Sequence, residues 1–412
     1  MEQRLLMRWY TQLVDLGVAM LQIGRVMGVG VALVIMIAAL SFIPLPIPAV
    51  TDFLTLYVPT VGLTRGIGLY DYAAQLGLAR QLFGPVIDTV KYPHYVYPPW
   101  FAYSVFFLGW LTPEHAARVW FWINLSMLTG SVILITLPWS AKWRVVALSV
   151  MIVSPTVISL VIVGQFTVSI LLGIAIVIYA ASRQSASLFV IGMLLMTFKP
   201  HVGVLPFIAA CGWLVIQRRP WQWRALAGVT AAILGLLAGV TLAYPQWLND
   251  YLAMLAIFRN LPDFGVCPNC SGGSIIAVRL LFGAPVISTA LYAGLLFALM
   301  AAGWFLWATS LSFNIELGLY WAMLVAILAI PYFNNYDHVC SLFPFLWLLQ
   351  TSKRRLEYWW LGTAFLLPWA GVILQERQIF AVGLVGQACI LFILMALRLW
   401  HGQRAVRPLT QS

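Results

Sequence analysis

The chain has 412 residues, of which 62% are hydrophobic and only 8% are charged, with a formal net charge of +11. Long apolar runs recur along almost its whole length. Since about 20 apolar residues cross a bilayer as one helix, a soluble core would not repeat such runs. The period-two alternation of a membrane β-barrel is absent. The sequence therefore predicts an all-α polytopic membrane protein.

The first 25 residues carry apolar side chains at helical spacing among several charges, which predicts a surface-lying amphipathic leader. The apolar run 26–43 follows without a small-residue cleavage site, so we expect a retained span and not a signal peptide.

Basic residues set the predicted topology, because Lys and Arg collect in cytoplasmic loops. If all the basic clusters between spans are cytoplasmic, both termini are cytoplasmic and about 12 spans result. The predicted spans are 26–43, 118–138, 145–163, 166–182, 186–198, 201–217, 225–243, 287–309, 316–331, 338–351, 357–374 and 378–398. The tail 399–412 is then cytoplasmic, and 287–398 is a C-terminal set of spans.

This topology requires 44–117 to be one external segment. Its apolar stretch Trp100–Leu111 is too short to span, and we expect a re-entrant or interfacial helix there. A second long external segment is 244–286. The whole charge of +11 falls on the cytoplasmic side, where an anionic leaflet explains it without nucleic acid. There is no Walker A motif, so any chemistry belongs to the external side.

Asp52 is the first carboxylate after the first span and follows the proline-rich stretch PLPIP. An acid at the water–lipid boundary suits a general base that meets a water-soluble substrate and a lipid. The alternative is an N-cap of the short helix FLTLYVP. For Asp71, in RGIGLYDYAAQ, we favour the N-cap of the next helix.

Two further motifs place polar groups beside apolar runs. In VYPPW, the prolines fix an extended entry into the next helix, so Tyr97 has an architectural role or contacts substrate. In IVGQF, Gln165 occupies a tight external turn. It either ties two helices together or contacts a substrate, since a buried amide needs partners.

Cationic residues are candidates for holding a phosphate. Lys199 and His201, in TFKPHVG, lie at the mouth between two spans, where they bind a lipid-linked phosphate or Lys199 simply snorkels. Arg279 follows the SGGS turn and either binds phosphate or anchors the loop in an ion pair. Asn335, Asp337 and His338 belong to the turn NNYDHVC, which suits sugar recognition or caps the next helix.

The order of these motifs resembles glycosyltransferase family 87. An Asp just after the first span is followed by G-x-x-LYD, YPP, GQ, KP, and a serine-rich turn before an arginine, over roughly residues 45–345. Members of that family are membrane enzymes of the GT-C fold that use a polyprenyl-phosphate sugar, typified by mannosyltransferases. The resemblance implies a conserved helical module, here 26–243, with juxtamembrane helices in its first external loop.

The resemblance also implies site roles. Asp52 becomes the base in an inverting transfer, and Lys199, His201 and Arg279 neutralise the leaving phosphate. Gln165, Tyr97 and the Asn335–His338 turn line the pocket. The implied partners are a polyprenyl-phosphate-linked sugar, with mannose as the sugar that the family suggests, a lipid or glycan acceptor and membrane lipids, in the cytoplasmic membrane. Asp52 has no second acid within two residues, so we expect no metal and no other cofactor. In place of the usual NQS before the arginine, this chain has Asn269-Cys270-Ser271.

Two other functions are alternatives to a glycosyltransferase. A transporter or flippase of a lipid-linked glycan should show ionisable residues at helix centres and inverted repeats, and the sequence shows almost none of the first and none of the second. A non-catalytic assembly subunit would tolerate the loss of Asp52.

Overall fold

The computed structural model describes residues 52–90, 92–217, 219–260, 294, 314–330 and 333–406. Within these residues the chain forms α-helices and two short 3-10 helices and no strand, which confirms the α class. The leader 1–25, the predicted spans 26–43 and 287–309, and Arg279 lie outside the described residues.

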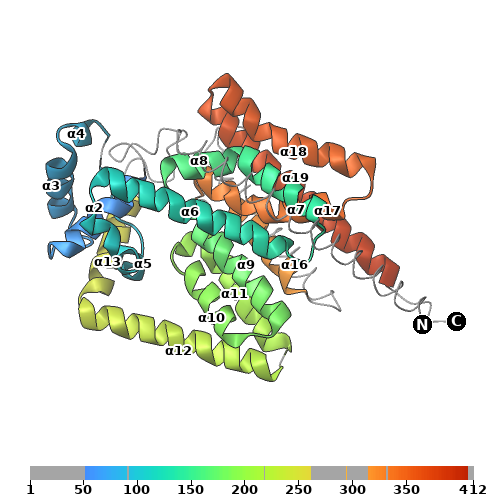
Figure 1. The fold of residues 1–412 in the computed structure, drawn as a ribbon, viewed down its shortest axis with the longest axis horizontal. Helices are drawn as coiled ribbons and strands as arrows, with labels where there is room; N and C mark the ends of the chain where they lie inside the picture. Colours follow the sequence, from blue (N-terminus) through green and yellow to red (C-terminus); the bar gives the residue numbers. More distant parts are fainter. Residues whose placement is uncertain are drawn as a thin grey trace, which may run out of the picture. The chain divides into compact units, whose positions relative to one another are not determined.

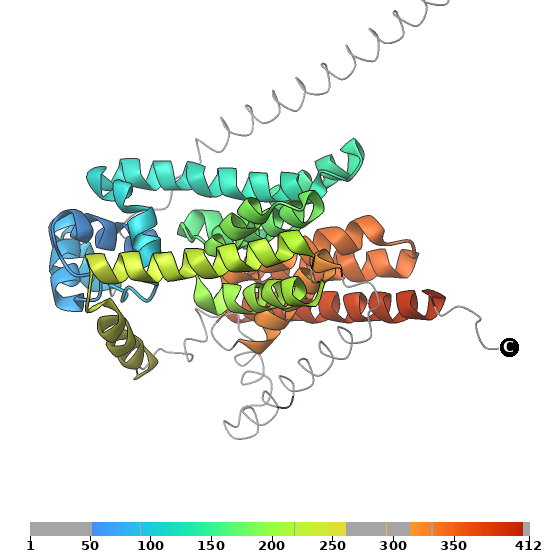
Figure 2. The same ribbon diagram turned by 90° about the horizontal axis from the view of Figure 1, so that it is seen from below.

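The segment before the long helices folds into short pieces. They are α2 (Phe53–Thr64), α3 (Tyr72–Phe83), α4 (Val86–Val90), α5 (Pro99–Ser104) and the 3-10 helix η1 (Phe106–Trp110). Figures 1 and 2 place them at one end of the helix bundle, where α6 begins and α12 ends. The prediction of a single helix over Trp100–Leu111 was wrong, because a turn at Val105 divides this segment into α5 and η1.

The longer helices follow in two groups. The first contains α6 (Pro113–Thr136), α7 (Ala141–Val153), α8 (Pro155–Val163), α9 (Val168–Arg183), α10 (Ala186–Met196), α11 (Pro200–Gln217), α12 (Pro220–Ala243) and α13 (Trp247–Asn260). The second contains α16 (Ile315–Ala329), the 3-10 helix η2 (Asn335–Ser341), α17 (Leu342–Thr351), α18 (Arg355–Leu374) and α19 (Arg377–Val406).

Four of the described helices are long and apolar enough to cross a membrane: α6, α11, α12 and the Gln378–Arg398 part of α19. The predicted span 145–163 is broken, because α7 and α8 meet at a bend of 57°. Ser154 is extended there and Pro155 opens the new helix, a position proline favours. If that bent pair is one span, the described residues hold up to five. The total of about 12 stays a prediction.

Helix α9 lies in the centre of the packing, with most of its side chains buried. Its Gly173 faces Gly192 of α10, and a Cβ on either residue would come within 2.6 Å of the other's carbonyl oxygen. The two backbones therefore touch, an approach that small residues permit between membrane helices. This contact holds α9, which follows directly on the turn that carries site residues, against α10.

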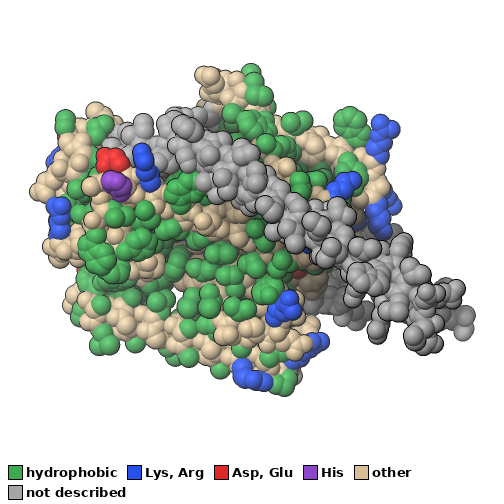
Figure 3. All heavy atoms as spheres, in the orientation of Figure 1, with side chains coloured by type: hydrophobic (Ala, Val, Ile, Leu, Met, Phe, Trp, Pro, Cys, Tyr) green, Lys and Arg blue, Asp and Glu red, His purple; other side chains and the backbone are tan. Residues whose placement is uncertain are grey.

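Large apolar side chains cover much of the surface between the ends of the bundle. Figure 3 shows hydrophobic side chains over much of the face between charged side chains at its ends. Leu234 and Leu242 of α12 are 61% and 85% exposed. An exposed apolar belt of this kind is expected where lipid is the solvent, which agrees with a multi-pass membrane protein.

Candidate functional site

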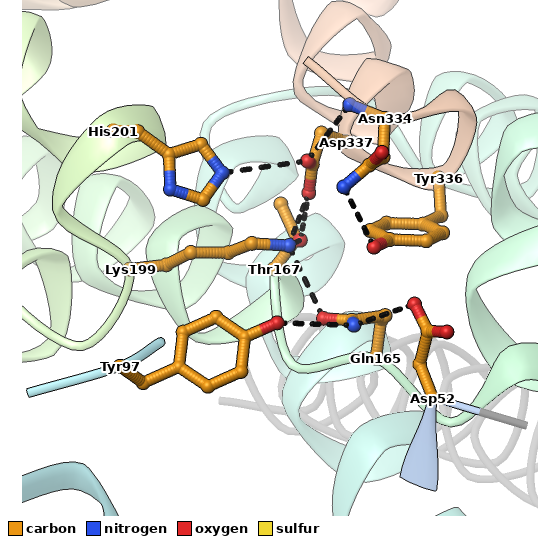
Figure 4. Close-up of polar contacts among 9 residues, drawn as sticks. All are labelled: Asp52, Tyr97, Gln165, Thr167, Lys199, His201, Asn334, Tyr336 and Asp337. Atoms are coloured by element: carbon orange, nitrogen blue, oxygen red, sulfur yellow. Dashed lines mark hydrogen bonds and ion pairs between the residues drawn. The ribbon is translucent and has the colours of Figure 1, made fainter. Parts of the chain in front are cut away.

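Five segments bring polar side chains together near the end of the bundle that carries α2 to α5. Figure 4 shows the nine residues involved. They come from the start of α2, the extended segment before α5, the α8–α9 turn, the α10–α11 turn and η2, and they are Asp52, Tyr97, Gln165, Thr167, Lys199, His201, Asn334, Tyr336 and Asp337. Sequence segments almost 300 residues apart thus share one site.

The α8–α9 turn depends on Gly164, which ends α8 with φ +76°. Its carbonyl accepts a hydrogen bond from Trp120 Nε1 at 2.7 Å. A Cβ at this position would lie only 3.0 Å from the Phe53 Cβ. A residue with a side chain would be strained in this conformation and crowded against α2. The glycine therefore lets the turn reach the start of α2 and places Gln165 beside Asp52.

Asp52 stands in the N-cap position of α2, but its side chain makes no capping hydrogen bond. Its Oδ2 instead accepts a hydrogen bond of 2.8 Å from Gln165 Nε2. The N-cap alternative is therefore wrong for the Asp52 side chain. Asp71, by contrast, accepts from the Ala74 N–H and caps α3, as predicted.

Gln165 has both ends of its buried amide engaged. Nε2 donates to Asp52 and to the Tyr97 hydroxyl, the latter at 3.3 Å, while Oε1 accepts from Lys199 Nζ at 3.1 Å. An ammonium only donates hydrogen bonds and a carboxylate only accepts them. If the amide were flipped, its N–H would face the ammonium and its oxygen would face the carboxylate, so both hydrogen bonds would be lost. Lys199 thus fixes the orientation in which Gln165 presents N–H to Asp52. Of the two predicted alternatives, Gln165 does join helices, and its contact with a substrate stays a prediction.

Lys199 lies in the break between α10 and α11, just before the proline that opens α11. It is fully buried, and its Nζ is 2.6 Å from Asp337 Oδ1, 2.9 Å from Thr167 Oγ1 and 3.1 Å from Gln165 Oε1. These three acceptors match the three N–H donors of an ammonium. Lys199 does not snorkel to the surface, and Asp337 already balances its charge.

Asp337 is the other half of this ion pair. It lies in the first turn of η2, where its Oδ2 accepts from the Asn334 N–H at 3.1 Å, and its Oδ1 accepts from the Thr167 hydroxyl. Burial alone would raise the pKa of Asp337, but Lys199 and His201 outweigh burial and hold that pKa well below its usual range. Asp337 is therefore ionised, and it both caps η2 and pairs with Lys199.

His201 and Tyr336 border this ion pair. The His201 side chain is 27% exposed, and its Nε2 lies 3.7 Å from Asp337 Oδ2. The Tyr336 ring faces Lys199, whose Nζ is 4.6 Å from the ring centroid. Its hydroxyl accepts from Asn334 Nδ2 at 2.8 Å. Burial and the Asp52 carboxylate raise the pKa of Tyr336 well above its ordinary value, so this phenol is neutral.

The structure unites most of the predicted site residues. The six that meet in Figure 4 are Asp52, Tyr97, Gln165, Lys199, His201 and Asp337. Asn335 and His338 lie on η2 outside this group, and Arg279 is not among the described residues. Thr167 was not predicted as a site residue. Its position two residues after Gln165 in VGQFT indicates a second polar side chain from the same turn, and its hydroxyl accepts a hydrogen bond from Lys199.

No group of three or more His, Cys, Asp or Glu side chains that could hold a metal occurs in the described part of the chain. Metal independence stays a prediction that rests on the sequence around Asp52.

An exposed apolar belt and a buried charge network at one end of the bundle define the class: a helical membrane protein with a polar site. The chain belongs to glycosyltransferase family 87, whose family model matches residues 95–331. The match covers more than half of the chain and includes Tyr97, Gln165 and Lys199, while Asp52 and Asp337 lie outside it. Comparisons with curated proteins and with solved structures gave no match. The predicted resemblance is confirmed, and the family indicates a glycosyltransferase.

Proposed function

We propose that the protein is an inverting glycosyltransferase that takes a sugar, mannose by resemblance to the family, from a polyprenyl-phosphate donor. The acceptor is a lipid or glycan on the external face of the cytoplasmic membrane, and both termini are cytoplasmic. Asp52 is the base that removes the proton from the acceptor hydroxyl as the hydroxyl oxygen attacks the anomeric carbon. The bond from that carbon to the phosphate oxygen breaks, and the polyprenyl phosphate leaves.

One observation carries this proposal: Asp52 is held by a neutral amide, while the nearby Asp337 is neutralised by a lysine. An amide N–H orients a carboxylate without supplying a positive charge, so Asp52 keeps the ability to accept a proton. Asp52 is also partly exposed, which gives an acceptor hydroxyl access to it. In this proposal Asp337 has a structural role and Asp52 has the chemical one.

Lys199 takes a different role from the one expected from the sequence. Because Asp337 balances its charge, Lys199 positions Gln165 and does not offer a free cation to the donor. His201, partly exposed beside Asp337, and Arg279 then remain the candidates for contacting the leaving phosphate. No metal takes part, and we expect transfer to persist in the presence of a chelator.

The test is sugar transfer in proteoliposomes, with radiolabelled polyprenyl-phosphate mannose and a membrane lipid extract. General-base catalysis typically contributes about 10² to 10⁴ in rate, so we expect Asp52→Asn to lower turnover by that range. Asp71→Asn is the matched control, since Asp71 only caps α3. Equal transfer by Asp52→Asn and wild type would remove Asp52 from the mechanism. No transfer by wild type with any of several donor sugars would refute the proposed donor class.

A further inference from the structure

Exposed cations and aromatic rings gather at the start of α18, at the end of the bundle opposite α2 to α5 (Figure 1). Lys353, Arg354 and Arg355 follow one another there, and all three are exposed. Figure 3 shows Lys and Arg side chains at that end of the molecule. The three cationic side chains make no ion pair or hydrogen bond with any described residue. Their charges are therefore available to a partner outside the chain.

The one carboxylate in the first turn of α18 is already neutralised by the fold. It belongs to Glu357, whose Oε2 lies 2.6 Å from Arg398 Nη2 of α19. The same oxygen accepts the Lys353 N–H at 3.2 Å. An anionic partner at the start of α18 therefore meets three free positive charges and no unpaired carboxylate in that turn.

Large apolar side chains occupy the same face of the helix as the cations. Trp359 and Trp360 are 67% and 48% exposed, and Leu356 is 66% exposed. Arg355 and Trp359 are four residues apart, as are Leu356 and Trp360, so these four side chains are neighbours on one helix face. Tryptophan gathers at the boundary between water and lipid, because its ring is apolar and its N–H is polar.

This face continues as an apolar stripe toward the end of α18. Trp359, Leu366 and Ile373 recur every seven residues, which is about two helical turns, and the last two are 63% and 74% exposed. The helix rises about 21 Å from Trp359 to Ile373, more than the depth of about 15 Å that one leaflet of hydrocarbon occupies. Cations, aromatic rings and an apolar stripe thus follow in the order of a phospholipid's phosphate, interface and acyl chains.

Two basic side chains elsewhere have partners within the chain. The Arg183 guanidinium lies 5.4 Å from the centroid of the Tyr179 ring, and Arg144 donates to the Trp139 carbonyl at 3.1 Å. The general attraction between basic loops and an anionic leaflet needs no defined site. The start of α18 differs because three free charges adjoin an exposed aromatic and apolar face.

We propose that the start of α18 is a binding site for an anionic phospholipid, whose phosphate contacts Arg354 and Arg355 and whose acyl chains lie along the stripe from Trp359 to Ile373. A guanidinium matches a phosphate with two parallel hydrogen bonds. The bound lipid would hold the start of α18, and through Glu357 the end of α19, at headgroup depth. This inference does not depend on the proposed function, and its test needs no sugar transfer.

The test measures lipid binding to the purified full-length protein in detergent by native mass spectrometry. The probes are dioleoyl-phosphatidylglycerol and dioleoyl-phosphatidylcholine, which share their acyl chains and phosphate and differ in net headgroup charge. We expect wild type to prefer phosphatidylglycerol. We expect Arg354→Gln/Arg355→Gln to weaken its binding by about tenfold to thirtyfold, the contribution of two basic residues beside an anionic lipid.

Lys142→Gln/Arg224→Gln is the matched control, because it removes the same charge from two exposed positions on α7 and α12. We expect this variant to keep the preference of wild type. Arg354→Lys/Arg355→Lys retains the charge, and we expect it to lose less affinity than the glutamine variant. Trp359→Leu should weaken the binding of both lipids by a similar factor, because the ring contacts the part that they share.

Three results would overturn the proposal. Equal losses in the α18 glutamine variant and its control would mean that the charge acts diffusely and forms no site at α18. Equal binding of the two lipids by wild type, a measurement that needs no variant, would exclude a preference for an anionic headgroup. Displacement of phosphatidylglycerol by glycerol 3-phosphate would mean that a soluble phosphate compound, and not a lipid, is the occupant.

Discussion

Replacing Lys199 with methionine would break the buried ion pair and leave Asp337 without its counter-charge. The two charged atoms are 2.6 Å apart, and the two side chains are 1% and 0% exposed. Removing one partner of a buried pair typically costs about 3–5 kcal/mol, because the remaining charge is uncompensated. We expect Lys199→Met and Asp337→Asn each to lower the free energy of unfolding by about this amount, a large share of a typical total of about 5–15 kcal/mol.

The double variant Lys199→Met/Asp337→Asn removes both charges, and we expect it to be more stable than the sum of the two single losses predicts, by about 1–3 kcal/mol. The assay is unfolding in mixed detergent micelles, followed by tryptophan fluorescence. The matched control is the exposed pair Arg80–Asp88, at 2.7 Å and with side chains 54% and 52% exposed. Arg80→Met should cost no more than about 1 kcal/mol. A Lys199→Met loss no larger than that of Arg80→Met would refute the reasoning.

Three further predictions concern the site and its scaffold. Gln165→Leu should lower turnover by about tenfold to a hundredfold through the loss of the amide that holds Asp52, measured in the proteoliposome assay. Gly164→Ala should cost about 1–2 kcal/mol, because alanine is strained at φ +76°, whereas Gly130→Ala, with no atom near its Cβ, should not destabilise. Because the folded-state pKa of Asp337 is depressed, its stabilising effect is present at neutral pH and is lost as pH falls below about 4; acid titration of unfolding should show this loss in wild type and not in Asp337→Asn.

Local signals in the sequence predicted local structure well. Asp71 caps α3, and the paired prolines after Tyr97 start α5 at Pro99. In each case the cause lies within a few residues, as a side chain that accepts a backbone N–H or a ring that fixes φ. The α class and the family followed from composition and from the order of motifs.

Hydropathy did not reveal where helices break. The run 145–163 is apolar throughout, so its composition indicates one span, but Ser154-Pro155 bends it by 57°. A proline at the start of a helix cannot donate the N–H that would continue the preceding helix. Pro155 therefore marks the break in the sequence, but the mean hydropathy of the run does not show it.

The ion pair could not be predicted from the sequence, because Lys199 and Asp337 are 138 residues apart along the chain. Both were singled out as polar residues beside apolar runs, which is where a buried charge needs a partner. Nothing local says which partner it has. The packing of α11 directly against α16, and of α9 against both, brings the two turns together.

Placing a glutamine between the ion pair and Asp52 has a chemical consequence. A lysine in direct contact with Asp52 would neutralise the proposed base. Gln165 instead orients the Asp52 carboxylate through its N–H and brings no positive charge to it. Without the ammonium on Oε1, the oxygen end of the amide loses the contact that fixes it, and its N–H is held less firmly toward the carboxylate. The Lys199→Met/Asp337→Asn double variant should therefore regain much of its stability and still turn over slowly. Full activity in that variant would mean that Asp52 does not depend on the ion pair for its orientation.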